Sequence, residues 1–202
     1  MRRRLLCAAV LACGCAGQGA YLISPALRAA PDTRVAVLPF ENRSAEPGAA
    51  AAMRALAAEG FGLRGYPPLP REEVDGAMGG AGLPAGAPPA AEAGRALKAG
   101  LLCYGTVEDF SLENLGQAVR KAVRLRLKIV SATPGETLFE GEGAGGDFRA
   151  FPGQAEARDY FMEQSALGGG AAPGPALKRE ARAAAAAPLD SCTSARSRDL
   201  EW

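Results

Sequence analysis

The 202-residue chain contains no histidine. Histidine is the side chain that most often acts as a general base near neutral pH, and it is the commonest metal ligand. Its absence excludes a Ser-His-Asp triad around Ser44, Ser111 or Ser165. A Ser-Lys dyad stays chemically open, but no spacing indicates one. The cysteines form no CxxC pair with a second pair, so the zinc-binding pattern is missing too. We therefore predict no catalytic residue, no metal site and no cofactor, and hence no enzyme.

The chain also has no surplus of charge of one sign. Lys and Arg together number 23 and Asp and Glu number 22, which gives a formal net charge of +1. Without a basic surplus there is no general attraction to nucleic acid, and we expect no nucleic-acid partner. Glycines cluster at 143–146 and 168–170, but neither cluster opens a GxxxxGK[ST] loop. The sequence therefore predicts no nucleotide site.

Long hydrophobic runs are missing as well. The apolar segment Leu5–Ala12 follows Arg2-Arg3-Arg4 and precedes small residues. It is far shorter than the roughly 20 residues that a helix needs to span a bilayer. A basic start, a short apolar core and small residues are typical of a secretory signal peptide, and not of a transmembrane helix.

The end of this segment resembles the signal of bacterial lipoproteins, in which a cysteine becomes the lipid-modified first residue of the mature protein. We assign residues 1–15 to the signal peptide and lipid attachment to Cys15. Cys13 is the competing site, and a plain cleaved signal is the third alternative. The resemblance implies acyl chains that hold the protein on a membrane. Because Ala16, and not aspartate, follows Cys15, the analogy implies the periplasmic face of the outer membrane. Residues 16–32 are then a flexible tether.

A strict alternation marks the best-defined part of the domain. Val123, Leu125, Leu127 and Ile129 alternate with mostly charged residues, which predicts a strand with one buried and one wet face. Residues 131–135 contain Pro and Gly and predict a turn into a second strand. With that loop, charge pairs would lie outside and an apolar pair inside. The expected opposite pairs are Arg126–Glu140, Arg124–Glu142 and Leu127–Phe139.

The rest of the chain alternates strands and helices. We predict strands over Thr33–Phe40, Phe61–Tyr66 and Leu101–Phe110, and helices over Ala49–Glu59, Arg71–Met78, Ala90–Ala99 and 155–164. This order predicts an α/β fold, a single domain with a mixed β-sheet flanked by helices. The sheet has a parallel βαβ start and an antiparallel C-terminal hairpin. The domain covers residues 33–166. Residues 167–202 are a linker, an alanine-rich helix over Ala176–Ala187 and a disordered tail, and whether that helix packs on the domain stays open.

Three pieces of the chain carry a resemblance: RVAVLPFENRS at 34–44, LLCYGTVEDF at 101–110 and VRLRLKIVSATPGETLFEGEG at 123–143. In order and spacing they resemble a family of bacterial lipoproteins of unknown function, typified by a neisserial surface antigen. This family is distantly related to CsgG, the curli secretion lipoprotein, and to LpoB, an outer-membrane activator of a penicillin-binding protein. The chain departs from the pattern at Cys103, Pro134 and Phe139 and in its short loop at Ser111–Ala118. The resemblance implies a fold and a location, and no catalytic residues.

Two charged groups allow a functional and a structural interpretation. Glu108, Asp109 and Glu113 could serve acid–base chemistry or bind calcium, but a solvated strand end is favoured because no partner lies at a fixed spacing. The basic residues of the central strand could bind phosphate, glycan or lipid headgroups, but cross-strand pairing with glutamates is favoured. These residues are Arg120, Lys121, Arg124, Arg126 and Lys128. Only Arg120 and Lys121 have no expected partner, so a small anionic contact stays open there.

The remaining cysteines are interpreted structurally. Cys103 lies inside a predicted strand and is expected to be a small buried hydrophobe. A disulfide with Cys192 is the alternative, because an oxidising compartment permits one.

Together these observations predict an outer-membrane-anchored lipoprotein with a non-enzymatic periplasmic domain. The domain would act in assembly or as an accessory module, binding another envelope protein or itself. A subunit of a CsgG-like secretion channel complex is the first alternative, and an envelope hydrolase is the second.

Overall fold

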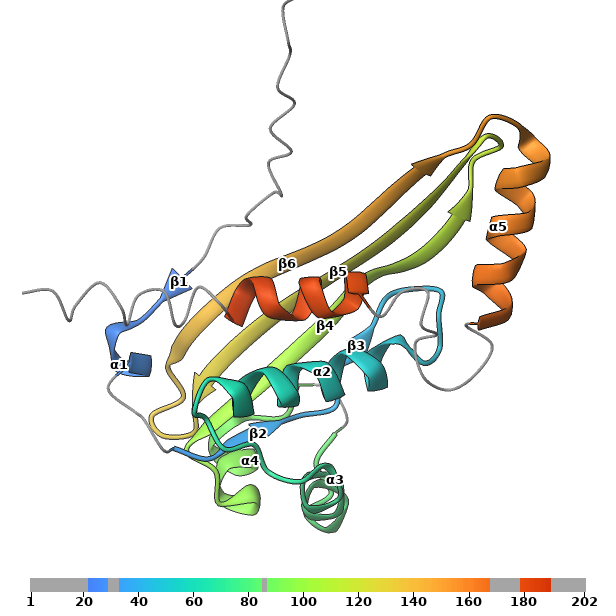
Figure 1. Cartoon of the computed structure of the whole chain (residues 1–202). Helices are drawn as coiled ribbons and strands as arrows, with labels where there is room; N and C mark the ends of the chain where they lie inside the picture. The colour runs from blue at the N-terminus through green and yellow to red at the C-terminus, as the bar shows by residue number, and fades with distance from the viewer. Residues whose placement is uncertain (1–21, 29–32, 85–86, 168–178, 190–202) are drawn as a thin grey trace, which may run out of the picture.

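The computed structural model describes residues 22–28, 33–84, 87–167 and 179–189 (Figure 1). The strands are β1 (Leu22–Ile23), β2 (Val35–Val37), β3 (Glu41–Asn42), β4 (Leu101–Asn114), β5 (Ala118–Ser131) and β6 (Thr137–Ala150). The helices are α1 (Pro25–Arg28), α2 (Ala49–Leu63), α3 (Arg71–Gly80), α4 (Ala90–Leu97) and α5 (Gln154–Leu167). A further helix covers residues 179–189, and we call it the C-terminal helix. The predicted signal peptide and Cys15 lie outside the described residues.

All six strands form one mixed sheet. Its order is β1-β6-β5-β4-β2, and β3 pairs with β4 beside β2. β2 and β3 run parallel to β4, whereas the β4–β5, β5–β6 and β1–β6 pairs are antiparallel. Helices lie against both faces of the sheet (Figure 1). The predicted fold class, a mixed α/β sheet with a parallel start and an antiparallel hairpin, is confirmed.

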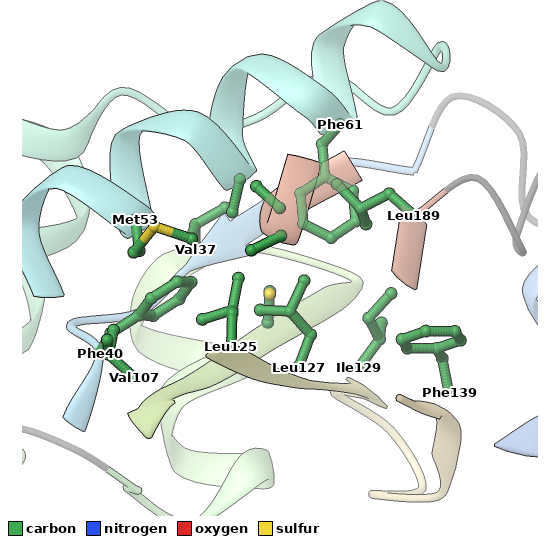
Figure 2. Packing of buried hydrophobic residues seen from close by; sticks show 14 of the residues in the cluster. Val37, Phe40, Met53, Phe61, Val107, Leu125, Leu127, Ile129, Phe139 and Leu189 are labelled. Atoms are coloured by element: carbon green, nitrogen blue, oxygen red, sulfur yellow. The ribbon is translucent and has the colours of Figure 1, made fainter. Parts of the chain in front are cut away.

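One face of the sheet, which we call the inner face, carries the larger core. The apolar residues of the predicted alternation in β5 all point to it, and each is at most 1% exposed. Met53 and Phe61 of α2 and Leu189 of the C-terminal helix close this core from above, as Figure 2 shows. Because full burial of each large apolar side chain contributes roughly 1.5–3 kcal/mol, this layer supplies much of the stabilising free energy.

We call the opposite face the open face, and the helices of the described residues cover it only near the start of β4. There Val74 and Met78 of α3 and Leu97 of α4 pack against Leu38 and Leu102. Further along the sheet the side chains on this face are mainly charged, and they alternate with the buried residues of the inner face. The sheet therefore carries its main core on one side and is covered at a corner on the other.

The predicted strand at Phe61–Tyr66 is wrong, because α2 continues through Gly60 to Leu63. A Cβ atom at Gly60 would lie 2.7 Å from Leu189 Cδ1, so this glycine makes room for the C-terminal helix and does not end α2. The Tyr66 hydroxyl donates a hydrogen bond to the Leu27 carbonyl oxygen (3.1 Å) from a loop. The parallel neighbour of β2 is therefore β4, and not the segment 61–66. The two short helices predicted next are confirmed as α3 and α4.

The predicted hairpin is present, but its register differs from the prediction by two residues. The observed opposite pairs are Arg126–Glu142, Lys128–Glu140 and Ile129–Phe139. The Ser131 amide donates to the Glu136 carbonyl oxygen (2.9 Å), and the pairing shifts between Ile129 and Val130. Because of this hydrogen bond and this shift, the strands do not pair as they would on either side of a regular five-residue loop. Because side chains alternate with period two, a two-residue shift leaves each side chain on its predicted face.

The three long strands extend past the core as an arm. β4, β5 and β6 each contain 14 residues, more than predicted. The predicted loop at Ser111–Ala118 is reduced to residues 115–117, and the Leu115 amide donates to the Ala118 carbonyl oxygen (2.7 Å). β6 continues through its glycines to Ala150, and α5 then folds back beside the end of the arm (Figure 1). The helix predicted around 155–164 is confirmed as α5.

The C-terminal helix packs on the inner face, across β6. Its apolar residues Ala181, Ala184, Ala185 and Leu189 are buried. A Cβ atom at Gly143 would collide with the Ala184 carbonyl oxygen, and one at Gly145 would collide with the Glu180 carbonyl oxygen. Glycine therefore allows the helix backbone to lie directly on the strand. The sequence left the packing of this helix open, and the structure places it in the main core.

Part of the predicted tether, 16–32, also lies on the domain. Leu22 and Ile23 form β1 and pair with Glu140 and Phe139 of β6. Leu27 in α1 is 2% exposed and belongs to the inner core. The described part of this segment, residues 22–28, is therefore attached to the far edge of the sheet.

Candidate functional site: the open face of the sheet

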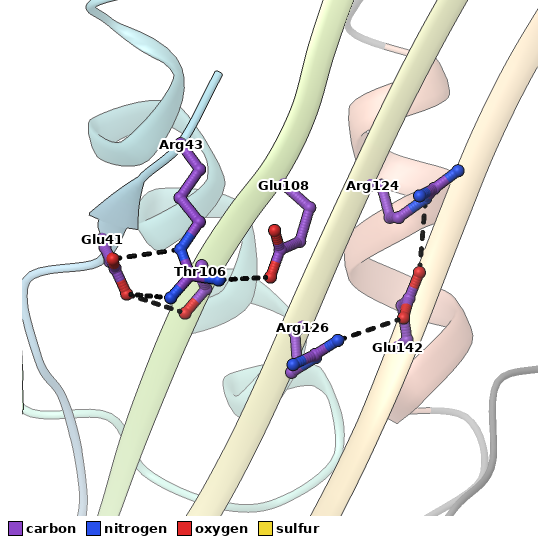
Figure 3. A network of polar contacts seen from close by, with 7 residues as sticks. All are labelled: Glu41, Arg43, Thr106, Glu108, Arg124, Arg126 and Glu142. Atoms are coloured by element: carbon purple, nitrogen blue, oxygen red, sulfur yellow. Dashed lines mark hydrogen bonds and ion pairs between the residues drawn. The ribbon is translucent and has the colours of Figure 1, made fainter.

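The open face carries a field of charged side chains whose positions follow from strand alternation. In β5, Arg124 and Arg126 point away from the core because the residues that alternate with them are buried. Glu142 of β6 lies between the two arginines: Arg124 Nε is 3.3 Å from Glu142 Oε1, and Arg126 Nη2 is 3.8 Å from Glu142 Oε2 (Figure 3). The predicted pairing of Arg124 with Glu142 is therefore present as an ion pair, although Arg126 is the residue directly opposite.

A second group of charges lies where β3 meets β4. Arg43 Nε lies 3.1 Å from Glu41 Oε1, and Arg43 Nη1 lies 3.4 Å from Glu108 Oε1 (Figure 3). Thr106 donates to Glu41 Oε2 at 3.5 Å. The hydrogen bond and the negative charge of Glu41, followed by the charge of Glu108, raise the pKa of Arg43. Arg43 is therefore a permanent positive charge within this part of the face.

The predicted carboxylate group does not form an acid–base pair. Glu108 faces Arg43, and Asp109 lies opposite Arg124 beyond a bulge in β4. Glu113 accepts two hydrogen bonds from Arg120, at 3.0 Å and 3.1 Å. Each carboxylate therefore faces an arginine, which favours the interpretation as a structural strand end. Among the described residues, no group of three His, Cys, Asp or Glu side chains could hold a metal ion.

The two basic residues without an expected partner both have one. Arg120 pairs with Glu113, whose hydrogen bonds and charge raise the pKa of Arg120. Lys121 points to the inner face, where Nζ donates to Gln164 Oε1 of α5 (2.9 Å) and lies 5.5 Å from the centre of the Tyr160 ring. The small anionic contact considered for these residues is therefore not supported, because their charges are already used inside the fold.

The end of the arm carries a cluster that the sequence analysis missed. Phe151 and Tyr160 lie with ring centres 5.1 Å apart, and the Arg149 guanidinium stacks 4.9 Å from the Tyr160 ring centre. Phe148 and Met162, by contrast, are 63% and 58% exposed. Aromatic residues in a segment of weak periodicity were the signal available in the sequence.

The cysteines and serines considered in the sequence analysis have structural roles or lie outside the described residues. Cys103 is fully buried in the inner core, as predicted for a small hydrophobe, while Cys192 lies outside the described residues. The Ser44 hydroxyl donates to Asn42 Oδ1 (2.7 Å), and the Ser165 hydroxyl donates to the Phe161 carbonyl oxygen (2.8 Å). None of the helices in the described residues has the length and apolar character needed to cross a bilayer.

Comparison with known proteins identifies the fold. No protein-family model matches the chain, and a search of curated proteins finds no significant match. The lipoprotein GNA1162 from Neisseria meningitidis aligns with a TM-score of 0.53 and 17% identity, over 66% of this chain and 98% of that chain. The PelC dodecamer from Paraburkholderia phytofirmans aligns with a TM-score of 0.51 and 17% identity, over 88% of this chain and 97% of that chain.

A third solved structure is less similar. The C-terminal domain of LpoB from Salmonella enterica aligns with a TM-score of 0.44 and 17% identity, over 56% of this chain and 82% of that chain. The predicted relationship to CsgG stays a prediction. At these identities the likeness concerns the fold alone: this chain has a fold that a bacterial lipoprotein also has.

Proposed function

We propose that this protein is a lipoprotein that is anchored through Cys15 to the periplasmic face of the outer membrane. Its domain is a non-enzymatic assembly or accessory module that binds another envelope protein or a second copy of itself. The open face of the sheet is the observation that carries this proposal. It is a broad strand surface with arginines and glutamates in neighbouring rows, and within the part of the chain that the structure describes helices cover only one corner of it.

The charges on the open face suit protein recognition. Arg124 and Arg126 are 56% and 50% exposed, so their ion pairs with Glu142 are solvated and add little to the stability of the fold. Such charges can exchange partners when a complementary surface approaches, and they then contribute to specificity and association rate. On the same face, Glu108, Asp109 and Glu113 each face an arginine, which argues against the alternative of an envelope hydrolase.

The fold comparisons support a membrane-anchored location and self-association as one kind of binding. GNA1162 is a lipoprotein, and PelC is a dodecamer. Self-association is therefore one form that the proposed assembly role can take, and a subunit of a CsgG-like secretion channel complex is the alternative form. Binding to a different envelope protein is equally compatible with the open face.

The anchor is tested by intact mass spectrometry of protein extracted from membranes. We expect the wild-type chain to begin at Cys15 and to carry acyl chains, because the small residues before Cys15 suit lipoprotein processing. Cys15→Ala should abolish the added mass, and Cys13→Ala should leave it unchanged. Loss of the acyl mass in Cys13→Ala alone would assign the anchor to Cys13. If the wild-type chain is unmodified and found in the soluble fraction, the proposal of a lipid anchor is refuted.

The binding role is tested by a photo-crosslinking amino acid placed at Arg126, with Arg95 on the exposed side of α4 as the matched control position. In cell envelopes, we expect adducts of defined mass from position 126 and none from position 95. An adduct of twice the chain mass would identify self-association, and any other defined mass would identify a partner. Absence of adducts at position 126, or equal adducts at both positions, would contradict the open face as the binding surface.

A further inference from the structure

The open face of the arm carries its charges in two neighbouring stripes of opposite sign. None of the 14 residues of β5 is acidic, and none of the 14 residues of β4 is basic. The basic stripe, on β5, consists of Arg120, Arg124, Arg126 and Lys128. The acidic stripe, on β4, consists of Glu108, Asp109 and Glu113. Two parallel stripes of opposite charge therefore run along the arm.

Cross-strand register joins the two stripes in rows. Asp109 lies opposite Arg124, and Glu113 lies opposite Arg120. Arg120 Nε is 3.0 Å from Glu113 Oε2, and the two side chains are 45% and 43% exposed. An ion pair as solvated as this one adds little to the stability of the fold. Each charge therefore keeps an exposed side on which it can meet a second charge of opposite sign.

A two-fold axis converts this pattern into a self-complementary surface. An axis that runs along the strands, midway between β4 and β5, exchanges the two stripes between one copy of the chain and a second copy. It leaves the rows in place, so Arg124 of one copy faces Asp109 of the other, and Arg120 faces Glu113. Each charge then has one opposite charge beside it in its own sheet and another across the interface, as an isologous contact requires.

The rest of the open face permits this contact. Helices α3 and α4 cover the start of β4, at the end away from Glu113, and α5 is held on the inner face through Gln164. Packed sheets cross at about 30°, which moves the helix-covered corners of two copies apart. The axis brings Glu142 toward Glu41, but Arg43 Nε lies 3.1 Å from Glu41 Oε1 and offsets that charge. The stripes therefore dominate the electrostatic match.

We propose that the open face of the arm binds the open face of a second copy of the chain, with the basic stripe of each over the acidic stripe of the other. This contact rests on the proposed function, because it uses the same face and names its partner. Opposite charges that meet in this way contribute to specificity and to the rate of association.

The size of the arm sets the strength of this contact. Residues 108–114 of β4 and the parts of β5 and β6 beside them cover roughly 23 by 14 Å, on the order of 300 Å². Stable complexes bury about 800 Å² per partner, so the pair is weak. Its formation depends on charge and on the high local concentration that a shared membrane surface provides.

The contact is tested by a photo-crosslinking amino acid at Ala122, illuminated in whole cells. Ala122 lies on the open face of β5 opposite Ser111, between the two charged rows and close to the axis. We expect an adduct of twice the chain mass. Arg158, exposed on α5, is the matched control position and should give none. Adducts of another mass only would overturn the second copy as the partner and leave the proposed function standing, and no adduct at all would also overturn the contact.

Charge reversal tests the arrangement of the stripes. Arg120→Glu with Arg124→Glu makes both stripes acidic in these rows, and Asp109→Arg with Glu113→Arg makes both basic. Each double variant alone should lose the adduct at least tenfold, because like charges then meet across the interface. Expressed together, the two variants should regain it as an adduct of one chain of each kind. Neither variant regains the pairs within its own sheet in the mixture, so this recovery reports contact between copies.

The variant with all four substitutions is the control for folding. It exchanges the stripes and restores every opposite pair, both within the sheet and between copies, so its adduct yield should be near that of the wild type. Wild-type yields from either double variant, or no recovery in the mixture, would overturn the arrangement. Whole-cell crosslinking does not require acyl chains, so its outcome is independent of the test of the lipid anchor.

Discussion

Replacing Phe139 by alanine is expected to lower the free energy of unfolding by about 3–5 kcal/mol, the usual loss when a fully buried phenylalanine is truncated. Phe139 is 0% exposed and lies opposite Ile129, at the point where β1, β6 and the inner core meet. The space left behind is bounded by the sheet and cannot collapse freely. Chemical denaturation measures the loss, and an unchanged slope with denaturant shows that the variant still unfolds in one step.

Phe148→Ala is the matched control for this prediction. Phe148 is the same residue type on the same strand, but it is 63% exposed and lies on the open face. We expect its truncation to change stability by no more than about 0.5 kcal/mol. Similar losses for both variants would contradict the assignment of the inner face as the core.

Gly143→Val is expected to displace the C-terminal helix from the sheet. The new side chain would collide with the Ala184 carbonyl oxygen and with Pro188. Overpacking costs about 1–3 kcal/mol, and a collision with backbone falls at the upper end because no rotamer change relieves it. We expect the free energy of unfolding to fall by about 3 kcal/mol, and hydrogen exchange at Ala181 and Ala185 to accelerate.

Ala144→Val, one residue along β6, serves as the control. Ala144 is exposed on the open face, so the same added methyl groups meet solvent there. Valine also suits a strand better than alanine, so stability should be unchanged or slightly raised. If Gly143→Val were as stable as Ala144→Val, the close packing of the C-terminal helix on β6 would be refuted.

The faces of the sheet could be predicted from the sequence. Alternation of apolar and charged residues is a local property of a strand, and it places Leu125 and Leu127 inside and Arg124 and Arg126 outside whatever the register. The predicted register was wrong by two residues, yet every side chain kept its face, because the period of a strand is two. For the same reason the charged candidate surface was visible in the sequence, although which glutamate meets which arginine was not.

The ends of the elements could not be predicted in the same way. The sequence predicts a helix that ends at Glu59, just before Gly60, and it predicts no strand through the glycines at 143–146. Both are places where the C-terminal helix approaches another element closely. A glycine in the sequence can mean a turn, a break or a close approach, and only the neighbour that arrives in space distinguishes them.

By itself, the sequence determined the class of the fold, the orientation of the central hairpin's side chains and the lack of a histidine-based site, because residue type and local periodicity suffice for these. The tertiary structure decided the register, the length of the arm, the position of the C-terminal helix and the partners of Arg120 and Lys121. The position of the C-terminal helix and the contact of Lys121 with Gln164 depend on segments far apart in the chain, as the approach of Leu189 to Gly60 does. Such contacts leave no periodic signal in the sequence, and so they appear only when the segments are brought together.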